Sequence, residues 1–312
     1  RGRAPVAVPG KEGSLRPVRF GPPAMKNVLN LAAKLKPRLA NEFQRRLLDA
    51  TMQSVQEASN PLRLNNFSAS FRELFRHILV ELAPDHEVKA SSWFEPDEKN
   101  AGKVTRAQKV NYVVHAGLDP TYVEDQLGID VTSERQELVK TIDRLNKFTH
   151  VNEDSFDSRP EDVEQHAFAV CDALASFLDC ADEARKLLCS RVEERVHDEV
   201  VSGAISETIL SIDEIATHHS VEDVDVHEIE ITSMDHAEIQ FTAYGSVGVE
   251  LQWGSNSDIR KGEGALFRDS YPLTCKFTSK VDRPEDLEMV ADSLCVDTGS
   301  WWDGYYDEGE PT

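Results

Sequence analysis

The chain has 312 residues, which is enough for two domains that each bury a core. Its 34 Lys and Arg residues are outnumbered by 56 Asp and Glu residues, so the formal net charge is −22. Hydrophobic residues make up 40%, and no apolar run approaches the roughly 20 residues that cross a bilayer, so the composition excludes membrane-spanning helices and we expect no membrane partner.

Charge is distributed unevenly along the chain. Residues 1–50 hold 11 Lys and Arg against 3 Asp and Glu, whereas residues 151–312 hold 11 against 38. An acidic surface repels nucleic acid at long range, so we expect RNA to be met near the basic first third. The acidic half is better suited to a protein partner, although acidity that only keeps the protein soluble explains the charge equally well.

The first predicted elements are an arm and two helices. Residues 1–24 are rich in Pro, Gly and Arg without periodicity, which predicts a flexible basic arm. Apolar residues then recur at helical intervals over residues 29–48. A second amphipathic helix is predicted to begin with a cap at Ser68 or Ser70 and to end before Pro84.

A strongly patterned helix follows, which is predicted to begin at Thr132 or Ser133 and to end at His150, within the stretch TSERQELVKTIDRLNKFTHVN. Ser133 and Gln136 have the spacing of a capping box at its start. One apolar stripe predicts its buried face, formed by Leu138, Ile142, Leu145 and Phe148. The pattern leaves the neighbouring polar side chains on the exposed side of the helix.

The end of this helix groups three polar side chains, Arg144, Asn146 and His150, within seven residues. Arginine can neutralise a phosphate through its planar fork of donors, and histidine can pass protons near neutrality. These are the groups that a ribonuclease without a metal needs. Arg144 and His150 lie about 120° apart around a straight helix, so one helix alone does not complete a site. A histidine that simply interacts with the C-terminal carbonyls of its helix explains the same residues equally well.

The segment resembles the R-x4-6-H motif of the HEPN superfamily, and LNKFTHV is its most similar part. The resemblance implies an all-helical bundle that dimerises to bring two motifs into one cleft, where it cleaves RNA without a metal in a prokaryotic defence or toxin system. By this analogy His150 serves as base or acid, Arg144 stabilises the charged transition state, and Asn146 orients His150 or the phosphate.

The next signals predict one long helix and then a change of period. Ser158, Pro160 and Glu161 are start signals of a helix that reaches about Val200. Beyond about residue 205 apolar residues alternate, which is typical of antiparallel strands. The predicted strands cover residues 226–231, 239–243, 247–253 and 273–277.

Turns are expected between these strands at residues 233–237 and 244–246. The tail GSWWDGYYDEGEPT is acidic and aromatic, and we expect it to dock through Trp301 and Trp302 because a wet tryptophan pair is unfavourable. LNKFTHV followed by a sheet domain with GSVGVELQWGSNSD also resembles the predicted nucleases associated with prokaryotic PIWI systems.

Other polar clusters in the sequence are weaker candidates for sites. A metal cluster can be drawn through His218, His219, Asp223, Asp225 and His227, but acids and histidines that alternate on a strand edge are more typical of solvated charges. A magnesium nuclease site of the restriction type is only loosely matched by Asp235 and Glu250. We therefore expect no metal and no cofactor.

Cysteine and histidine usage elsewhere favours structural roles. The five cysteines include no Cys-x-x-Cys pair, so neither a disulfide framework nor a zinc ribbon is expected, and a reducing cytoplasm fits best. Cys171, Cys180 and Cys189 are interpreted as buried thiols, and His115 as a satisfied core histidine.

The resulting prediction is an α+β protein with three parts: a basic arm over residues 1–24, a HEPN-like helical domain over residues 25–205, and an antiparallel β domain over residues 206–312. The preferred function is a metal-independent endoribonuclease that forms a homodimer. Two alternatives stay open. One is a non-catalytic dimeric adaptor whose acidic β domain docks a protein partner, and the other is a magnesium-dependent nuclease in the β domain.

Overall fold

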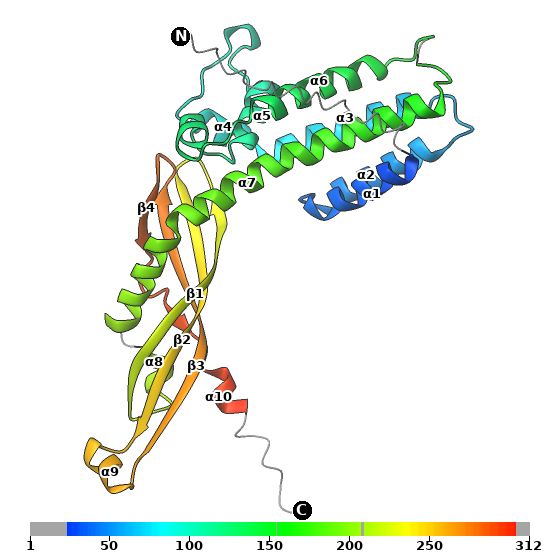
Figure 1. The fold of residues 1–312 in the computed structure, drawn as a ribbon. Helices are drawn as coiled ribbons and strands as arrows, with labels where there is room; N and C mark the ends of the chain where they lie inside the picture. Colours follow the sequence, from blue (N-terminus) through cyan, green and yellow to red (C-terminus); the bar gives the residue numbers. More distant parts are fainter. Residues whose placement is uncertain (1–23, 154, 207–208, 304–312) are drawn as a thin grey trace, which may run out of the picture.

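The fold is α+β, as the sequence predicts: a helical part is followed by a small antiparallel sheet (Figure 1). The structure is a computed structural model, and it describes residues 24–153, 155–206 and 209–303. The expected flexible arm at residues 1–24 lies outside these residues except for Ala24.

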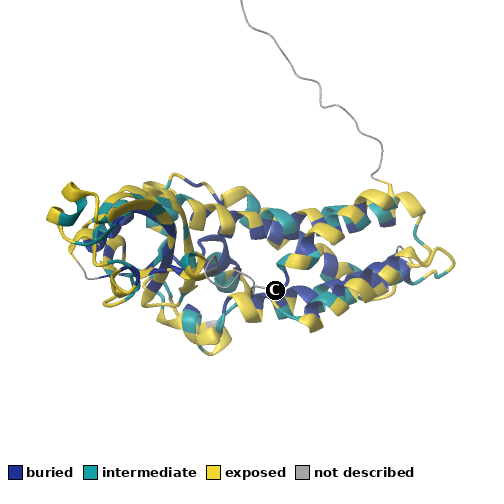
Figure 2. Cartoon of the chain, turned by 90° about the horizontal axis from the view of Figure 1, so that it is seen from below, coloured by how far each residue is buried: buried dark blue, intermediate teal, exposed yellow. Residues whose placement is uncertain are grey.

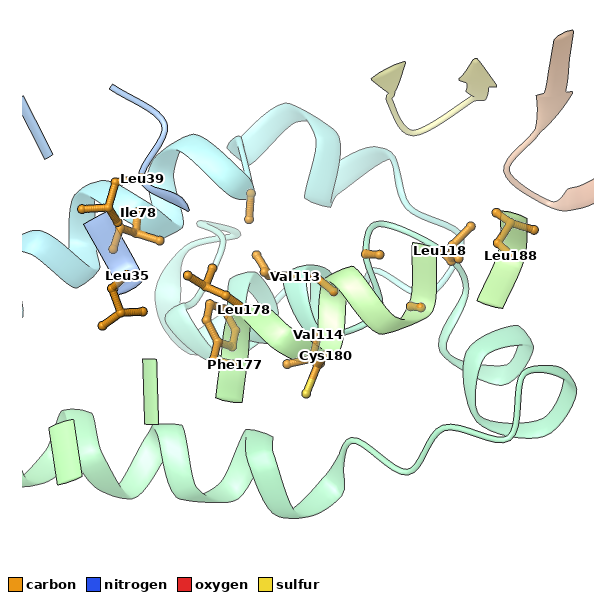
Figure 3. Packing of buried hydrophobic residues seen from close by; sticks show 14 of the residues in the cluster. Leu35, Leu39, Ile78, Val113, Val114, Leu118, Phe177, Leu178, Cys180 and Leu188 are labelled. Atoms are coloured by element: carbon orange, nitrogen blue, oxygen red, sulfur yellow. The ribbon is translucent and has the colours of Figure 1, made fainter. Parts of the chain in front are cut away.

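The helical part packs six helices and the first half of a seventh around one buried core, part of which Figure 3 shows. The first six helices are α1 (Met25–Leu35), α2 (Glu42–Gln56), α3 (Arg63–Leu82), α4 (Asp85–Ala90), α5 (Arg106–Val114) and α6 (Thr132–Phe148). Short helical turns lie between them at Lys36–Arg38, Glu98–Asn100 and Tyr122–Gln126. In Figure 3, Leu35 and Leu39 lie beside Ile78 of α3, and Val113 of α5 lies beside Leu178.

Helix α3 begins earlier than predicted, so the expected cap at Ser68 or Ser70 is wrong. Its first turn is at Arg63 because Leu64 and Phe67 extend the buried stripe towards the N-terminus. Ser68 is fully buried inside the helix, and its hydroxyl contacts a histidine of another helix. The end of α3 before Pro84 is confirmed.

Helix α6 begins at Thr132 and has the buried stripe, both as predicted, but it ends at Phe148, two residues before the expected end at His150. Leu138, Ile142 and Leu145 are buried and Phe148 is half-buried. The predicted capping box at Ser133 is wrong, because the carboxylate of Asp130 accepts a hydrogen bond from the Thr132 N–H at 2.9 Å. The Ser133 hydroxyl turns to its neighbour Glu134 instead.

The long helix α7 (Pro160–Ser206) joins the helical part to the sheet (Figure 1). Its first half packs against α1, α5 and α6, and its second half packs against strands β1 and β4. Val192, Val196 and Val200 recur every four residues and are buried along the second half. The buried core therefore continues from the helices into the sheet, past the boundary expected near residue 205.

Five strands form the antiparallel sheet, which follows the short helix α8 (Leu210–Asp213). They are β1 (His218–Met234), β2 (Glu238–Trp253), β3 (Ala265–Lys280), β4 (Arg283–Met289) and β5 (Cys295–Val296). Their order is β1-β2-β3-β4, and β5 pairs with β3. Seen from below, the sheet curls and its buried residues line the inner side of the curve (Figure 2).

The turn predicted at residues 233–237 is confirmed, whereas the turn predicted at residues 244–246 is wrong. Strand β2 runs without interruption through Gly245, which pairs with Val226 of β1. A Cβ atom at Gly245 would overlap the backbone carbonyl of Asp225. Glycine is present here because the two strand backbones approach closely at a β-bulge, and not because the chain reverses.

The aromatic tail docks on the sheet through Trp301, as expected. Trp301 lies in the short helix α10 (Gly299–Asp303), and its ring stacks on Trp253 with centroids 5.4 Å apart. Phe267 meets the same ring edge-on at 5.8 Å. Trp302 is 43% exposed, and residues 304–312 of the tail lie outside the described part of the chain. The connection between β2 and β3 contains the short helix α9 (Asn256–Lys261).

Candidate functional site at the corner between α6 and α7

The three predicted site residues lie at the end of α6, where the chain turns into α7. The Arg144 side chain is 55% exposed, and its guanidinium lies 3.8 Å from the carboxylate of Glu137. Asn146 is half-buried, and its backbone carbonyl accepts a 2.7 Å hydrogen bond from the Thr149 hydroxyl. His150 is exposed just beyond the helix. All three side chains can therefore be reached from solvent.

No hydrogen bond or ion pair joins any two of these three side chains in the described part of the protein. One chain thus presents the arginine and the histidine at the same corner without a direct contact between them. A site shared between two copies stays a prediction.

A buried side chain of α3 holds this corner in place. The Asn65 amide donates hydrogen bonds to the backbone carbonyls of Phe148 at 3.0 Å and His150 at 3.4 Å, and to the Ser155 hydroxyl at 3.0 Å. Asn65 is 4% exposed, so the side chain is shielded from competing water. The backbone on both sides of the motif histidine is thereby tied to a neighbouring helix.

The loop after the motif is tied down in the same way. Ser155 is fully buried, and it exchanges hydrogen bonds with Asn152 in both directions at 3.0 Å. The N–H of Asp157 donates to the carbonyl of Pro61 at 2.9 Å. Phe156, between these two anchored positions, is nevertheless 52% exposed. The loop therefore holds an aromatic ring at the surface on a fixed backbone.

A pocket of about 470 Å³ opens at this corner. Its lining includes two aromatic rings, two cations and one histidine, namely Phe148, Phe156, Lys147, Arg159 and His166. Lys147 and Phe148 come from the end of α6, and Phe156 and Arg159 come from the following loop. His166 comes from the first turns of α7. The pocket therefore combines flat apolar surface with positive charge next to the motif.

His166 also lies in this pocket, although the sequence did not single it out as a site residue. Its Nε2 atom lies 3.2 Å from the Ser68 hydroxyl, and its ring meets Phe148 edge-on with centroids 4.9 Å apart. Burial, with a smaller contribution from the positive charge of Arg144, lowers the pKa of His166 to about 4. The imidazole is therefore neutral at pH 7. The available signal was its spacing from Val163 and Val170, which places a polar ring on the buried face of α7.

The depressed pKa of His166 predicts a pH-dependent stability. The unfolded chain binds a proton at this histidine near pH 6.5, whereas the folded chain does so only near pH 4. The stabilisation is therefore complete above about pH 6.5 and is lost as the pH falls towards 4, by on the order of 3 kcal/mol. Urea unfolding of native protein and His166→Leu at several pH values checks this prediction.

The difference in unfolding free energy between the two proteins isolates this one histidine from other titrating groups. It should shrink steadily between pH 6.5 and pH 4. A difference that stays constant over this range would contradict the prediction.

The other candidate sites do not assemble in the described residues. No group of three or more His, Cys, Asp or Glu side chains there is placed to hold a metal ion. His219 pairs with Asp213, and His227 pairs with Asp225, so these histidines have separate partners.

The two carboxylates that loosely match a magnesium nuclease site of the restriction type also have separate roles. Asp235 accepts two backbone N–H groups in the β1–β2 turn, which lower its pKa, and Glu250 pairs with Arg268 at 2.9 Å. Each carboxylate is thus explained by local structure.

The structural roles expected for the remaining residues are confirmed in three cases. His115 is fully buried, and its ring nitrogens contact the Asn111 carbonyl and the Glu124 carboxylate. Cys171 and Cys180 are buried, whereas Cys189 is only half-buried.

Among the described residues, no helix has the length and apolar character needed to cross a membrane.

Fold and corner together define a two-part α+β protein with a pocket of aromatic and cationic side chains at one end of its helical part. Two family models match the chain, and both are described as predicted pPIWI-associating nuclease. One covers residues 36–174, including the corner, and the other covers residues 181–302, including the sheet. Over most of its length the chain is therefore similar to the predicted pPIWI-associating nucleases, which supports a nuclease.

This finding confirms the resemblance to predicted nucleases of PIWI systems. Neither of the two matches is to the HEPN superfamily. No curated protein and no solved structure matches the chain.

Proposed function

We propose that the protein is a metal-independent endoribonuclease of HEPN type that acts as an effector in a prokaryotic defence or toxin system. The observation that carries the proposal is the corner between α6 and α7. There Asn65 holds the backbone of the motif end, while the side chains of Arg144 and His150 stay open to solvent beside a pocket. The similarity to predicted pPIWI-associating nucleases supports the nuclease and the defence setting.

The proposed reaction needs only acid, base and positive charge. The ribose 2′-oxygen attacks the adjacent phosphorus, its proton passes to the His150 imidazole, and a 2′,3′-cyclic phosphate forms as the bond to the 5′-oxygen breaks. The 5′-oxygen leaves with a proton supplied by a second imidazole or by water. Arg144 neutralises the charge that builds on the phosphate, and Asn146 orients the phosphate or His150.

A homodimer completes the site in this proposal. The chain places Arg144 and His150 at one exposed corner without a contact between them, and a second copy at the same corner would supply the missing arginine or histidine. His166 belongs to the pocket wall, and as a neutral ring it does not repel the positive charges that a phosphate requires.

The proposal is tested by the sugar and metal requirements of the purified protein. Single-stranded RNA should be cleaved in the presence of EDTA and should yield cyclic phosphate ends. An oligonucleotide of the same sequence with 2′-deoxyribose should stay intact, because it lacks the attacking hydroxyl. Cleavage of the 2′-deoxyribose oligonucleotide as well as the RNA, or RNA cleavage that stops on addition of EDTA, would overturn the proposal.

A second candidate function is a non-catalytic dimeric adaptor, and the composition of β1 favours it. This strand lies at one edge of the sheet and carries acidic residues but no Lys or Arg over residues 218–234. Such an edge is suited to a basic protein surface. A folded dimer that leaves RNA intact, with and without magnesium, would favour this function over the nuclease.

A further inference from the structure

The corner pocket has the chemistry of a site for one unpaired nucleotide. Its volume is about 470 Å³, and it is bounded by the Phe148 and Phe156 rings on the apolar side. Unpaired bases bind proteins mainly by stacking on aromatic rings, while their phosphates bind cations. The pocket offers both kinds of group within one wall.

Phe156 is the side chain best placed for stacking. It is 52% exposed, although its neighbours Ser155 and Asp157 are held by hydrogen bonds to α3 and to the Pro61 carbonyl. An exposed aromatic ring on an anchored backbone loses little conformational freedom when a base covers it. The core rings Phe67 and Phe71 are fully buried and cannot be reached by a base.

The charges of the pocket fit a single phosphate. Lys147 is exposed, and its ammonium makes no hydrogen bond or ion pair within the described residues, so this charge is available. Arg159 is held by the Asp162 carboxylate through two hydrogen bonds of 2.8 and 3.0 Å, which neutralise it in part. Asp157 adds one further negative charge to the lining. Lys147 is thus the one cation of the described lining without a carboxylate partner, and a single available charge suits one phosphodiester better than a polyphosphate.

We propose that the pocket binds one unpaired nucleotide of a single strand, with the base stacked on Phe156 and its phosphate at Lys147 and Arg159. The inference rests on the proposed function for its place beside the motif, and it names what that site recognises. Stacking and phosphate binding are common to RNA and DNA. The sugar preference therefore has to come from the experiment.

Binding can be measured apart from cleavage by fluorescence anisotropy. The probes are labelled single strands of 2′-O-methyl RNA and of DNA with one sequence, neither of which has a 2′-hydroxyl that can attack. Phe156→Ala should bind roughly tenfold to a hundredfold more weakly than the native chain. Phe156→Trp should bind as the native chain does, because it restores a stacking surface.

Phe43→Ala is the matched control, because Phe43 is 57% exposed, close to the 52% of Phe156, but lies on α2, outside the lining of the pocket. Its ring meets His77 edge-on with centroids 4.9 Å apart. It should leave binding unchanged, and circular dichroism should show both alanine variants folded. Lys147→Ala should weaken binding and reduce its salt dependence. A duplex of the same sequence should show no dependence on Phe156, because its bases are already stacked.

The outcomes separate this inference from the proposed function. Neither probe can be cleaved by attack of a 2′-hydroxyl, so a native chain that binds the probes but leaves RNA intact would keep the nucleotide site and lose the proposed function. Dependence on Phe156 for either probe supports the site, and the probe that binds tells which sugar is accepted. Equal binding by native chain and Phe156→Ala, no binding of either probe by the native chain, or an equal loss in Phe43→Ala would overturn the inference.

Discussion

Replacing His150 with alanine should lower the rate of metal-independent RNA cleavage by at least about a hundredfold, because a positioned acid or base contributes about 10²–10⁴ to such a rate. Arg144→Ala should cause a loss of similar size, since the arginine stabilises the negative charge of the transition state. Both side chains are exposed, so their removal should leave folding unchanged. Initial rates of cleavage with EDTA present measure the effect.

The chain offers a close control for each variant. Lys140 lies on the same helix as Arg144 and approaches the same Glu137 carboxylate, at 4.0 Å against 3.8 Å, so Lys140→Ala removes a matched positive charge. His86 is 77% exposed and far along the sequence, and His86→Ala removes a matched imidazole. Both controls should retain native rates. Full activity in His150→Ala, or losses in the controls as large as those in the site variants, would remove the assignment.

Mixing the two inactive variants tests whether the site is shared. In a dimer of one Arg144→Ala chain and one His150→Ala chain, a cleft built from both copies still holds one native arginine and one native histidine. Partial recovery of cleavage in the mixture would therefore support the shared site. No recovery in a mixture shown to form such dimers would assign a complete site to each chain.

Asn65→Leu should be the most damaging single change at the corner. The leucine has a similar volume but no donors, so the carbonyls of Phe148 and His150 and the Ser155 hydroxyl lose their shared partner. The amide has two N–H groups for these three contacts, so two hydrogen bonds at about 1 kcal/mol each predict a loss of about 2 kcal/mol in the free energy of unfolding. Urea denaturation of the variant and the native chain measures this loss.

The same variant should also slow RNA cleavage under conditions where it stays folded, because the backbone at His150 is no longer held. Asn100→Ala is the matched control, since its amide donates to the Asp97 carboxylate at the exposed surface. It should change stability by less than about 0.5 kcal/mol. A loss of similar size in both variants would show that Asn65 has no special role at the corner.

Local pattern was sufficient where one element buries one face. The stripe of Leu138, Ile142 and Leu145 predicted α6 and its buried face, because an amphipathic period of 3.6 residues is a property of the segment itself. The start signals near Pro160 likewise located α7, although the helix continues six residues beyond the predicted end near Val200. The alternation of apolar residues located parts of β1, β2 and β3 for the same reason, but it did not predict β4 or β5.

Local pattern failed where a residue acts through a neighbour that is distant in sequence. Glycine is typical of turns, but Gly245 lies within β2. Glycine is required there because the backbone of Asp225 approaches it from β1. Serine is typical of helix N-caps, but Ser68 is buried inside α3 and contacts His166. Both errors assign to local geometry a residue whose role is set by packing.

The sequence by itself determined the α+β class, the succession of a helical part and an antiparallel sheet, and the grouping of Arg144, Asn146 and His150 at the end of one helix, because each depends on residues close together in the chain. Only the tertiary structure decided that Asn65 of α3 holds this end in place and that His166 of α7 lies in the wall of its pocket. Asn65 and Phe148 are 83 positions apart along the chain, and His166 is 98 positions from Ser68, which it contacts. Contacts of that range depend on how the helices pack together, and no local pattern encodes that packing.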